Sequence, residues 1–353
     1  MGDINVIVNQ TANQTFALHM YHAIISGTSS GLSILGAIII FVTYFTIKEI
    51  QNFTRQLLLY LTMADILTAV GHLIAVGRYV SENFCENSTS KAVYCGVNDN
   101  ATYDILSVCV IQSFLTTYSN LVSFFWIAMI AVHLWSSVVL KTWRTEMLQT
   151  QVVYHVICWI VPFSIVYALL IESKLGEDYC YGTGIWCGIR AVSQGEKQWL
   201  QYVTDVAWQI TCYLIVSVLY IHLKFYLKLY YHGQRLAMVA GRLRNEDENF
   251  LFIWIVIYLL KLWGLTRFFI MTYLPPDKLY NSQTMKTFLE FLLIMQSYGA
   301  GGQGFWNCVF FCFLDKTVWK NMMLYITRDN SEERENILSN NSTRENRDIS
   351  ERI

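Results

Sequence analysis

Residues 56–77 read QLLLYLTMADILTAVGHLIAVG, and Asp65 is the one formally charged side chain in this run when histidine is neutral. A helix that crosses the hydrocarbon core of a membrane needs about 20 mostly apolar residues. Runs of comparable length and composition recur along the chain, at residues 22–47, 105–140, 151–171, 199–223, 249–273 and 284–314. Because these runs are apolar on every face rather than at alternate positions, they predict an all-α bundle of seven transmembrane helices.

The amino-acid composition supports this prediction independently. The chain of 353 residues is 54% hydrophobic and only 14% charged, whereas an average soluble domain carries about 25% charged residues. Lipid is therefore the partner expected to cover the apolar surface. The net charge of −1 creates no overall field that would favour nucleic acid as a partner.

Cysteines and glycosylation acceptors orient the chain in the membrane better than basic residues, which are almost as numerous in the loops of either side. With the N-terminus outside, five of the nine cysteines face the oxidising side, where disulfides persist. Asparagines of glycosylation signals also fall there, although Asn52, Asn340 and Asn341 carry such signals inside. The expected glycosylation sites are Asn9, Asn13, Asn87 and Asn100, and the outer cysteines are Cys85, Cys95, Cys109, Cys180 and Cys187.

This orientation divides the chain into four parts. Residues 1–21 form the extracellular N-terminus, and residues 22–314 form the seven-transmembrane domain. Residues 315–327 combine apolar and lysine side chains in a pattern typical of an amphipathic helix in the inner membrane interface. Residues 328–353 are too poor in apolar residues to fold alone, and they predict a disordered cytoplasmic tail.

Charged residues at membrane depth are costly and usually face a cavity or a partner. Here they are Asp65, Asp205, Lys261, Arg267 and Glu290. Counting about 1.5 Å per residue from the helix ends places Asp205, Arg267 and Glu290 one to two turns below the outer surface, and the other two near mid-depth. These three, with nearby Trp208 and Gln209, predict a polar ligand site. Ion pairing between helices, or an arginine that reaches the lipid headgroups, would explain the same charges without a ligand.

A second group of polar residues predicts a switch that rearranges on activation, with Asp65 as a hydrated hub. The seventh run contains GAGGQG at residues 299–304, and each glycine weakens a helix by about 1 kcal/mol relative to alanine. These glycines predict either a hinge or close packing between helices, and Gln303 and Asn307 would bond to backbone groups that a bend exposes. The residues proposed for the switch are Asp65, Lys261, Trp263, Gln303, Gly304 and Asn307.

No catalytic or cofactor-binding pattern accompanies these runs. The seven histidines include no His-Glu-x-x-His pair of the kind found in zinc hydrolases. Phosphate-binding and dinucleotide-binding glycine motifs are missing, and the last run has no lysine at mid-depth to hold retinal. The sequence therefore predicts neither an enzyme nor a site for a metal or cofactor.

Short motifs follow one another along the chain in the order known from one class of receptors. They are LLLYLTMADIL (57–67), CVIQ (109–112), SFFW (123–126), HV (155–156), WxxP (159–162), WC (186–187), LKLW (260–263), RF (267–268), QG (303–304) and NC (307–308). Each motif is short, but their joint order over about residues 20–325 is specific. The sequence resembles secretin-like and cAMP-receptor-like G-protein-coupled receptors, and looks closest to the orphan G-protein-coupled receptor 157 group.

This resemblance implies a heptahelical receptor in the plasma membrane that responds to an extracellular ligand, whose identity the sequence does not specify. The receptor would catalyse nucleotide exchange on a heterotrimeric G protein. The resemblance also implies a disulfide between Cys109 and Cys187. The pairing of Cys85, Cys95 and Cys180 stays open, and one arrangement would join Cys85 to Cys95 and leave Cys180 single. Only about 20 residues precede the first run, so capture of a peptide hormone by a large ectodomain is not expected.

The G protein is expected to contact the basic third inner loop, together with the second inner loop and the interfacial helix. The basic residues of that loop are Lys224, Lys228, Arg235, Arg242 and Arg244. Topology and binding to anionic lipid would explain them equally well. A receptor kinase and arrestin are further expected partners of the tail, although any polar tail carries phosphorylatable residues. The alternative function is a multi-pass transporter or channel that uses the intramembrane charges as a pathway, but no inverted repeat is visible.

Overall fold

The computed structural model describes a defined part of the chain. It comprises residues 2–85, 105–140, 148–176, 185–191, 193–230, 255, 258–275, 282–325 and 327. Of these, only the backbone is described for residues 2–19, 82–85, 148, 194, 227 and 230. The description below refers to these residues.

Helices make up nearly all of the described structure. The α-helices are α1 (Gly2–Thr46), α2 (Phe53–Cys85), α3 (Val108–Val139), α4 (Leu148–His155), α5 (Val161–Ile171), α6 (Gln194–Gln201), α7 (Ala207–Tyr230), α10 (Gln283–Gly301) and α11 (Gln303–Cys308), with further helices at 258–273 and 316–325. A 3₁₀ turn forms η1 (Lys48–Ile50), and π-helical turns form η2 (Val156–Ile160), η3 (Tyr202–Val206) and η5 (Val309–Leu314). Two short antiparallel strands, β1 (Leu175–Gly176) and β2 (Gly188–Ile189), pair through Leu175 and Ile189.

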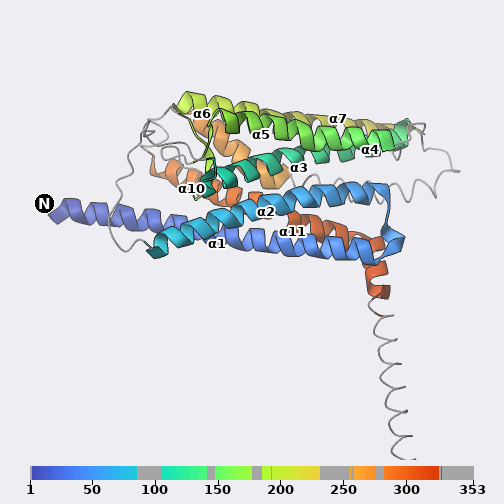
Figure 1. Cartoon of the computed structure of the whole chain (residues 1–353), viewed down its shortest axis with the longest axis horizontal. Coiled ribbons are helices and arrows are strands. Elements are labelled where there is room, and N and C mark those ends of the chain that lie inside the picture. The colour runs from blue at the N-terminus through green and yellow to red at the C-terminus, as the bar shows by residue number, and fades with distance from the viewer. Residues whose placement is uncertain are drawn as a thin grey trace, which may run out of the picture.

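The helices run side by side along the long axis of the molecule, and successive long helices run in opposite directions (Figure 1). At one end α2 and α5 finish, α3, α6 and α10 begin, and the paired strands lie between them. We call this the hairpin end. The backbone helix of α1 projects beyond the bundle at the same end, whereas η1 turns the chain at the opposite end.

Several of these helices are suited to crossing a membrane. By length and composition, five helical stretches of the described chain qualify, at Met20–Thr46, Phe53–Ser81, Val108–Val139, Gln149–Ile171 and Gly195–Tyr226. Large apolar side chains on their outer faces are exposed rather than packed, including Phe45 at 65% and Ile221 at 67%. Apolar surface on this scale needs a covering of lipid or protein. These five stretches match the first five runs expected from the sequence.

The sixth and seventh expected runs are described differently. The sixth was expected at 249–273, and its described helical part is 258–273. The seventh is divided by Gly302, where backbone angles of φ −88° and ψ −2° end α10 before α11 begins. None of α10 (19 residues), α11 and η5 (6 residues each) is among the five qualifying stretches, so the match to a seven-helix bundle depends on reading these three as one crossing.

The packing centre of the bundle is α3. Its partners include α2, α5 and α7, and its Trp126 is completely buried in a cluster with Leu57, Leu61 and Val216. The helix begins at Ser107, whose hydroxyl accepts a hydrogen bond from the Val110 amide at 3.3 Å. Serine favours this position because its side chain satisfies an amide that the first helical turn leaves without a partner.

Two expectations about the ends of the bundle can be compared with the structure. The segment 1–21 was expected to precede the first helix, but α1 is continuous from Gly2, and no proline before Pro162 interrupts it. At the other end, helix 316–325 begins after Asp315 and packs Val318 against Ile47 and Ile50. It turns away from the bundle axis (Figure 1), as an interfacial helix would. The tail at 328–353 lies outside the described residues.

Candidate functional site

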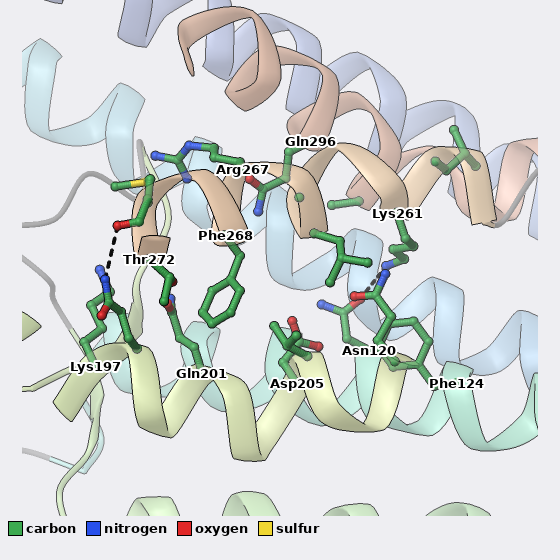
Figure 2. A pocket seen from close by; sticks show the side chains of 18 residues that line it. Asn120, Phe124, Lys197, Gln201, Asp205, Lys261, Arg267, Phe268, Thr272 and Gln296 are labelled. Atoms are coloured by element: carbon green, nitrogen blue, oxygen red, sulfur yellow. Dashed lines mark hydrogen bonds between the residues drawn. The ribbon is translucent and has the colours of Figure 1, made fainter. Parts of the chain in front are cut away.

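A cavity of about 170 Å³ lies among α3, α6, η3, α7, helix 258–273 and α10. Both polar and apolar side chains point into it (Figure 2). A cavity of about 150 Å³ lined by apolar side chains admits benzene, so this one has room for a small organic molecule. Its lining comes from helices that are far apart in sequence, which is the usual construction of a ligand site between helices.

One wall of the cavity is a polar stripe on the continuous helix formed by α6, η3 and α7. Its members recur at helical spacing, which places them on one face. The turn η3 is π-helical, and such turns often occur at functional sites. Asp205 belongs to this turn, and the stripe consists of Lys197, Gln198, Gln201, Asp205 and Gln209.

The opposite wall is helix 258–273, with α10 beside it. Arg267 and Thr272 lie toward the end of the cavity where Lys197 lies, and Lys261 lies toward the other end (Figure 2). Lys197 is only 4% exposed, and it is close enough to Arg267 for their charges to interact. The cavity therefore has a cationic region near the hairpin end, where α6 begins.

The deeper end of the cavity is held by a contact between helices. The Lys261 ammonium donates a hydrogen bond to Asn120 Oδ1 on α3 at 2.7 Å and lies over the Phe124 ring at 5.7 Å. It is also close enough to Asp205 and Asp65 for their charges to interact. Lys261 thus belongs both to the cavity and to the polar group below it.

That polar group centres on Asp65, which is 3% exposed. Its carboxylate accepts hydrogen bonds from the Asn307 side-chain amide at 2.7 Å and from the Ser123 hydroxyl at 3.2 Å. The three residues come from α2, α11 and α3, so a single carboxylate joins three helices. Charge-assisted hydrogen bonds of this kind are stronger than neutral ones.

Glycines bring α11 close to α1 beside this group. The Gly304 amide donates to the Ser33 hydroxyl at 2.8 Å, and a β-carbon built at Gly304 would lie 2.5 Å from that same oxygen. A β-carbon at Gly36 would come within 2.9 Å of the Gly304 carbonyl oxygen. The structure shows close packing at Gly304 and a break in the helix at Gly302, and movement of that break on activation stays a prediction.

The structure brings together only part of the predicted ligand site. Asp205, Gln209 and Arg267 line the cavity, whereas Trp208 and Glu290 are not among its lining residues. Trp208 packs on Phe125 with 5.3 Å between ring centroids, and Glu290 is exposed. The reason is rotation about the helix axis, since each residue advances about 100°. The depth count took account of height along the helix but not of this angle.

The proposed switch residues also occupy separate places. Asp65, Asn307 and Gly304 meet as described, and Lys261 lies above them at the cavity. Gln303 is 4% exposed, and its Nε2 has no hydrogen-bond partner among the residues described. Trp263 is not part of either group and packs edge-on against Phe291 of α10, with 5.8 Å between centroids.

Several lining residues escaped the sequence interpretation because they were assessed one at a time. The stripe on α6 to α7 repeats at intervals of three or four residues, a helical pattern of polar residues that indicates a buried polar face. Searching for such stripes rather than for charges would have found Lys197, Gln198 and Gln201, but not the three residues missed on other helices. The missed polar residues are Asn120, Lys197, Gln198, Gln201, Thr272 and Gln296.

A second set of contacts fastens the segment between α5 and α6 to the start of α3. Cys109 and Cys187 form a disulfide with 5.4 Å between their α-carbons, the pairing that the resemblance implied. The Gln112 side-chain oxygen accepts from the Cys187 amide at 2.9 Å, and the Ser113 hydroxyl donates to the Gly188 carbonyl at 2.7 Å. Lys174 forms an ion pair with Glu196 at the start of α6. The hairpin end is therefore tied to the first turns of both helices.

The remaining residues singled out from the sequence lie either away from the cavity or outside the described residues. Lys224 and Lys228 lie on the last turns of α7, away from the hairpin end. At Asn9, Asn13 and Cys85 only the backbone is described. The remaining glycosylation sites, cysteines and basic loop residues lie outside the described ranges: Asn87, Asn100, Cys95, Cys180, Arg235, Arg242 and Arg244.

Comparison with known proteins adds two findings. Residues 14–226 match the model of the Frizzled/Smoothened family membrane region. The chain is similar to the G-protein coupled receptor 157 of Homo sapiens, at 26% identity over 82% of this chain and 79% of that protein, and to that of Mus musculus, at 24% identity over 82% and 81%. It is also 25% identical to the Ascaroside receptor GPR2 of Arthrobotrys oligospora over 52% of this chain and 42% of that protein. The expected resemblance to the receptor 157 group is confirmed.

Proposed function

Because the chain belongs to the Frizzled/Smoothened family by its membrane region, and is thus a non-enzymatic multi-pass receptor of the G-protein-coupled class, we propose that it transmits the binding of a small extracellular ligand to a heterotrimeric G protein. In this proposal seven helices cross the plasma membrane, and the hairpin end faces outward. The observation that carries the proposal is the cavity near the hairpin end, whose deep end adjoins the polar group at Asp65.

The contacts at Lys261 supply a physical route between the two places. A ligand that changes the position of Lys261 changes its hydrogen bond to Asn120 on α3 and its interaction with Asp65. Asp65 in turn holds Asn307 of α11, beyond the break at Gly302. A ligand shifts a conformational equilibrium only by its difference in affinity for the two states. Contact between the ligand and Lys261 would supply this difference in affinity between the two states.

Nucleotide exchange tests this proposal directly. The full chain in lipid nanodiscs should accelerate exchange on at least one class of purified heterotrimeric G protein. Lys261→Met should change ligand-independent exchange by about fivefold or more, which is the lower end of typical coupling between sites. Lys286→Gln is the matched control, because Lys286 is an exposed lysine of α10 that is absent from the cavity lining.

The rival transporter or channel predicts a different result. If the nanodisc-embedded chain leaves exchange at the receptor-free rate for every G-protein class, while liposomes containing it show solute or ion flux, the receptor proposal is wrong. A topology with the hairpin end on the cytoplasmic side would also contradict it, since the ligand would then have to enter from within the cell.

A further inference from the structure

We infer that the cavity takes a small soluble organic anion, with a carboxylate or phosphate held between Lys197 and Arg267. This inference rests on the proposed function only in treating the cavity as the ligand site. The lining residues contain the cations Lys197, Lys261 and Arg267 and one carboxylate, that of Asp205. Cations therefore outnumber carboxylates among the lining residues that the structure describes.

The charges are distributed unevenly along the cavity. Lys261 lies at the deep end, where it interacts with the carboxylates of Asp205 and Asp65. Lys197 and Arg267 lie at the other end and interact with each other as like charges. Bringing like charges together raises the free energy of the site. An anion between them would lower that free energy.

The acidic residue nearest in sequence does not enter this end of the cavity. Glu196 precedes Lys197 but forms its ion pair with Lys174, beside the paired strands. It is absent from the lining, as is Glu290. The helix thus turns Lys197 inward and Glu196 toward the strands, which separates a cation from the carboxylate next to it.

Two further lining atoms point to a ligand. The Thr272 hydroxyl and the Gln296 side-chain oxygen are buried without a hydrogen-bond partner among the described residues. Leaving such atoms unsatisfied costs free energy, and a bound molecule with hydrogen-bonding groups would recover it. Thr272 lies at the cationic end, where its hydroxyl can donate to an anion, and Gln296 faces the middle of the cavity (Figure 2).

The size and the remaining lining restrict the ligand further. Phe124, Leu265, Phe268 and Met271 contribute apolar surface, so an apolar body adjoining the anionic group fits the cavity. A volume of about 170 Å³ suits an aromatic or short aliphatic acid. An anionic group held by two cations, one of them an arginine able to bind it through two parallel hydrogen bonds, also gives the ligand a defined orientation.

The test uses benzoate and phenyl phosphate as probes, with neutral benzamide and cationic benzylamine as matched comparisons. Each is titrated into the full chain in phosphatidylcholine nanodiscs, and affinity is read from the rise in unfolding temperature. Benzoate and phenyl phosphate should bind at least about tenfold more tightly than benzamide, as expected for charge-assisted hydrogen bonds. Benzylamine should bind no better than benzamide.

Variants then locate the site. Arg267→Gln and Lys197→Gln should each reduce the preference for benzoate over benzamide severalfold, whereas Lys286→Gln should leave it unchanged. Equal affinity of the wild-type protein for benzoate and benzamide would overturn the inference without depending on any variant. So would a preference that survives both cavity substitutions.

Two further arms distinguish a soluble anion from a lipid headgroup, and ligand binding from signalling. Phosphatidylglycerol added to the nanodiscs should leave the preference for benzoate intact. Loss of that preference would mean that the cations bind a lipid headgroup, and it would overturn the inference of a soluble ligand. No G protein is present in the binding assay. Anion binding without nucleotide exchange would therefore contradict the proposed function alone, whereas exchange without anion selectivity would contradict this inference alone.

Discussion

Asp65 shows how much one buried carboxylate can organise. Its two oxygens accept from Asn307 and Ser123, and both donors come from helices that must keep their positions relative to α2. A carboxylate is suited to this place because it accepts on both oxygens and donates on neither. An asparagine at position 65 has one oxygen, which can accept from Asn307, and one amide, to which the Ser123 hydroxyl would have to turn as an acceptor, so both hydrogen bonds to a charged group are lost.

The first prediction concerns Asp65→Asn and the double variant in which Asp65 and Asn307 exchange side chains. Asp65→Asn should lower the unfolding temperature and change ligand-independent nucleotide exchange severalfold, because a hydrogen bond to a charged group contributes about 1.5–3 kcal/mol. The double variant Asp65→Asn/Asn307→Asp restores a carboxylate facing an amide, and should recover much of both properties. Exchange that stays at the wild-type rate in the single variant, at normal surface expression, would exclude the role of Asp65 in signalling.

The ion pair between Arg55 and Asp315 offers a second residue-level test. The Arg55 guanidinium lies 3.1 Å from the Asp315 carboxylate, with the side chains 9% and 12% exposed. Asp315 also caps helix 316–325, accepting from the Thr317 amide at 2.9 Å and the Val318 amide at 3.2 Å. One carboxylate therefore joins the start of α2 to the start of the last helix.

The second prediction separates these two contributions. Asp315→Asn keeps an effective cap but leaves Arg55 buried without its ion partner, which should destabilise the protein by about 3–5 kcal/mol. Asp315→Ala should cost about 1 kcal/mol more, because the cap is lost as well. Thermal unfolding can be followed by labelling of the buried cysteines Cys158, Cys212, Cys308 and Cys312. Equal losses in both variants would mean that the cap contributes nothing.

At the level of elements, glycines set the distance between helices. A β-carbon built at Gly299 would overlap the Leu260 carbonyl oxygen, with the Leu260 carbonyl carbon 2.9 Å away. Helix 258–273 therefore touches α10 through backbone. Small residues at such crossings allow close approach of helices in membranes. This contact lies beside the cavity, whose lining includes Leu260 and Ala300.

The third prediction is that Gly299→Ala separates these helices. Backbone cannot yield as a side-chain tip can, so the substitution should lower stability by about 1–3 kcal/mol, the usual cost of overpacking. It should also weaken benzoate binding by displacing the cavity wall. Gly31→Ala is the control, because nothing lies within 4 Å of a β-carbon there, and alanine is the better helix former. A loss of stability in both variants alike would show that the crossing at Gly299 is not responsible.

Elements also show where sequence reasoning succeeds and where it stops. Five of the expected spans correspond to apolar helices, because burial in lipid requires the same length and composition whatever the packing. The π-helical turn at Asp205 carries no comparable signal. The angular position of a residue around its helix is harder still to predict from the sequence. Glu290 and Gln296 differ by six residues, or about 240°. That angle separates an exposed carboxylate from a residue of the cavity.

At the scale of the whole molecule, polar contacts form a line along the bundle inside an apolar exterior. The line begins at Lys197 and Arg267, passes through Lys261 and the Asp65 group, and ends at the pair of Arg55 with Asp315. Exposed apolar side chains cover the outside of the same helices. In a membrane this arrangement keeps these charges away from lipid.

The direction of that line across the membrane is the subject of the fourth prediction. If the hairpin end faces outward, Asn9, Asn13, Asn87 and Asn100 are exposed to the glycosylation machinery, while Asn52, Asn340 and Asn341 are not. Expression in a glycosylating host, followed by enzymatic removal of N-glycans, should reduce the apparent mass of the wild-type chain. Replacing the first four asparagines with glutamine should abolish that reduction, and replacing the other three should leave it unchanged.

This experiment is decisive under the proposed topology, because seven crossings would put the two sets of asparagines on opposite sides in either orientation. Asn52 lies just before α2, at the end away from the paired strands, and its side chain accepts from the Arg55 amide at 2.8 Å. Glycosylation of Asn52 instead of the first four asparagines would show that the bundle has the reverse orientation in the membrane. The cavity would then open toward the cytoplasm, and Lys224 and Lys228 at the far end of α7 would face outward. A ligand from outside and a G protein from inside require the first result.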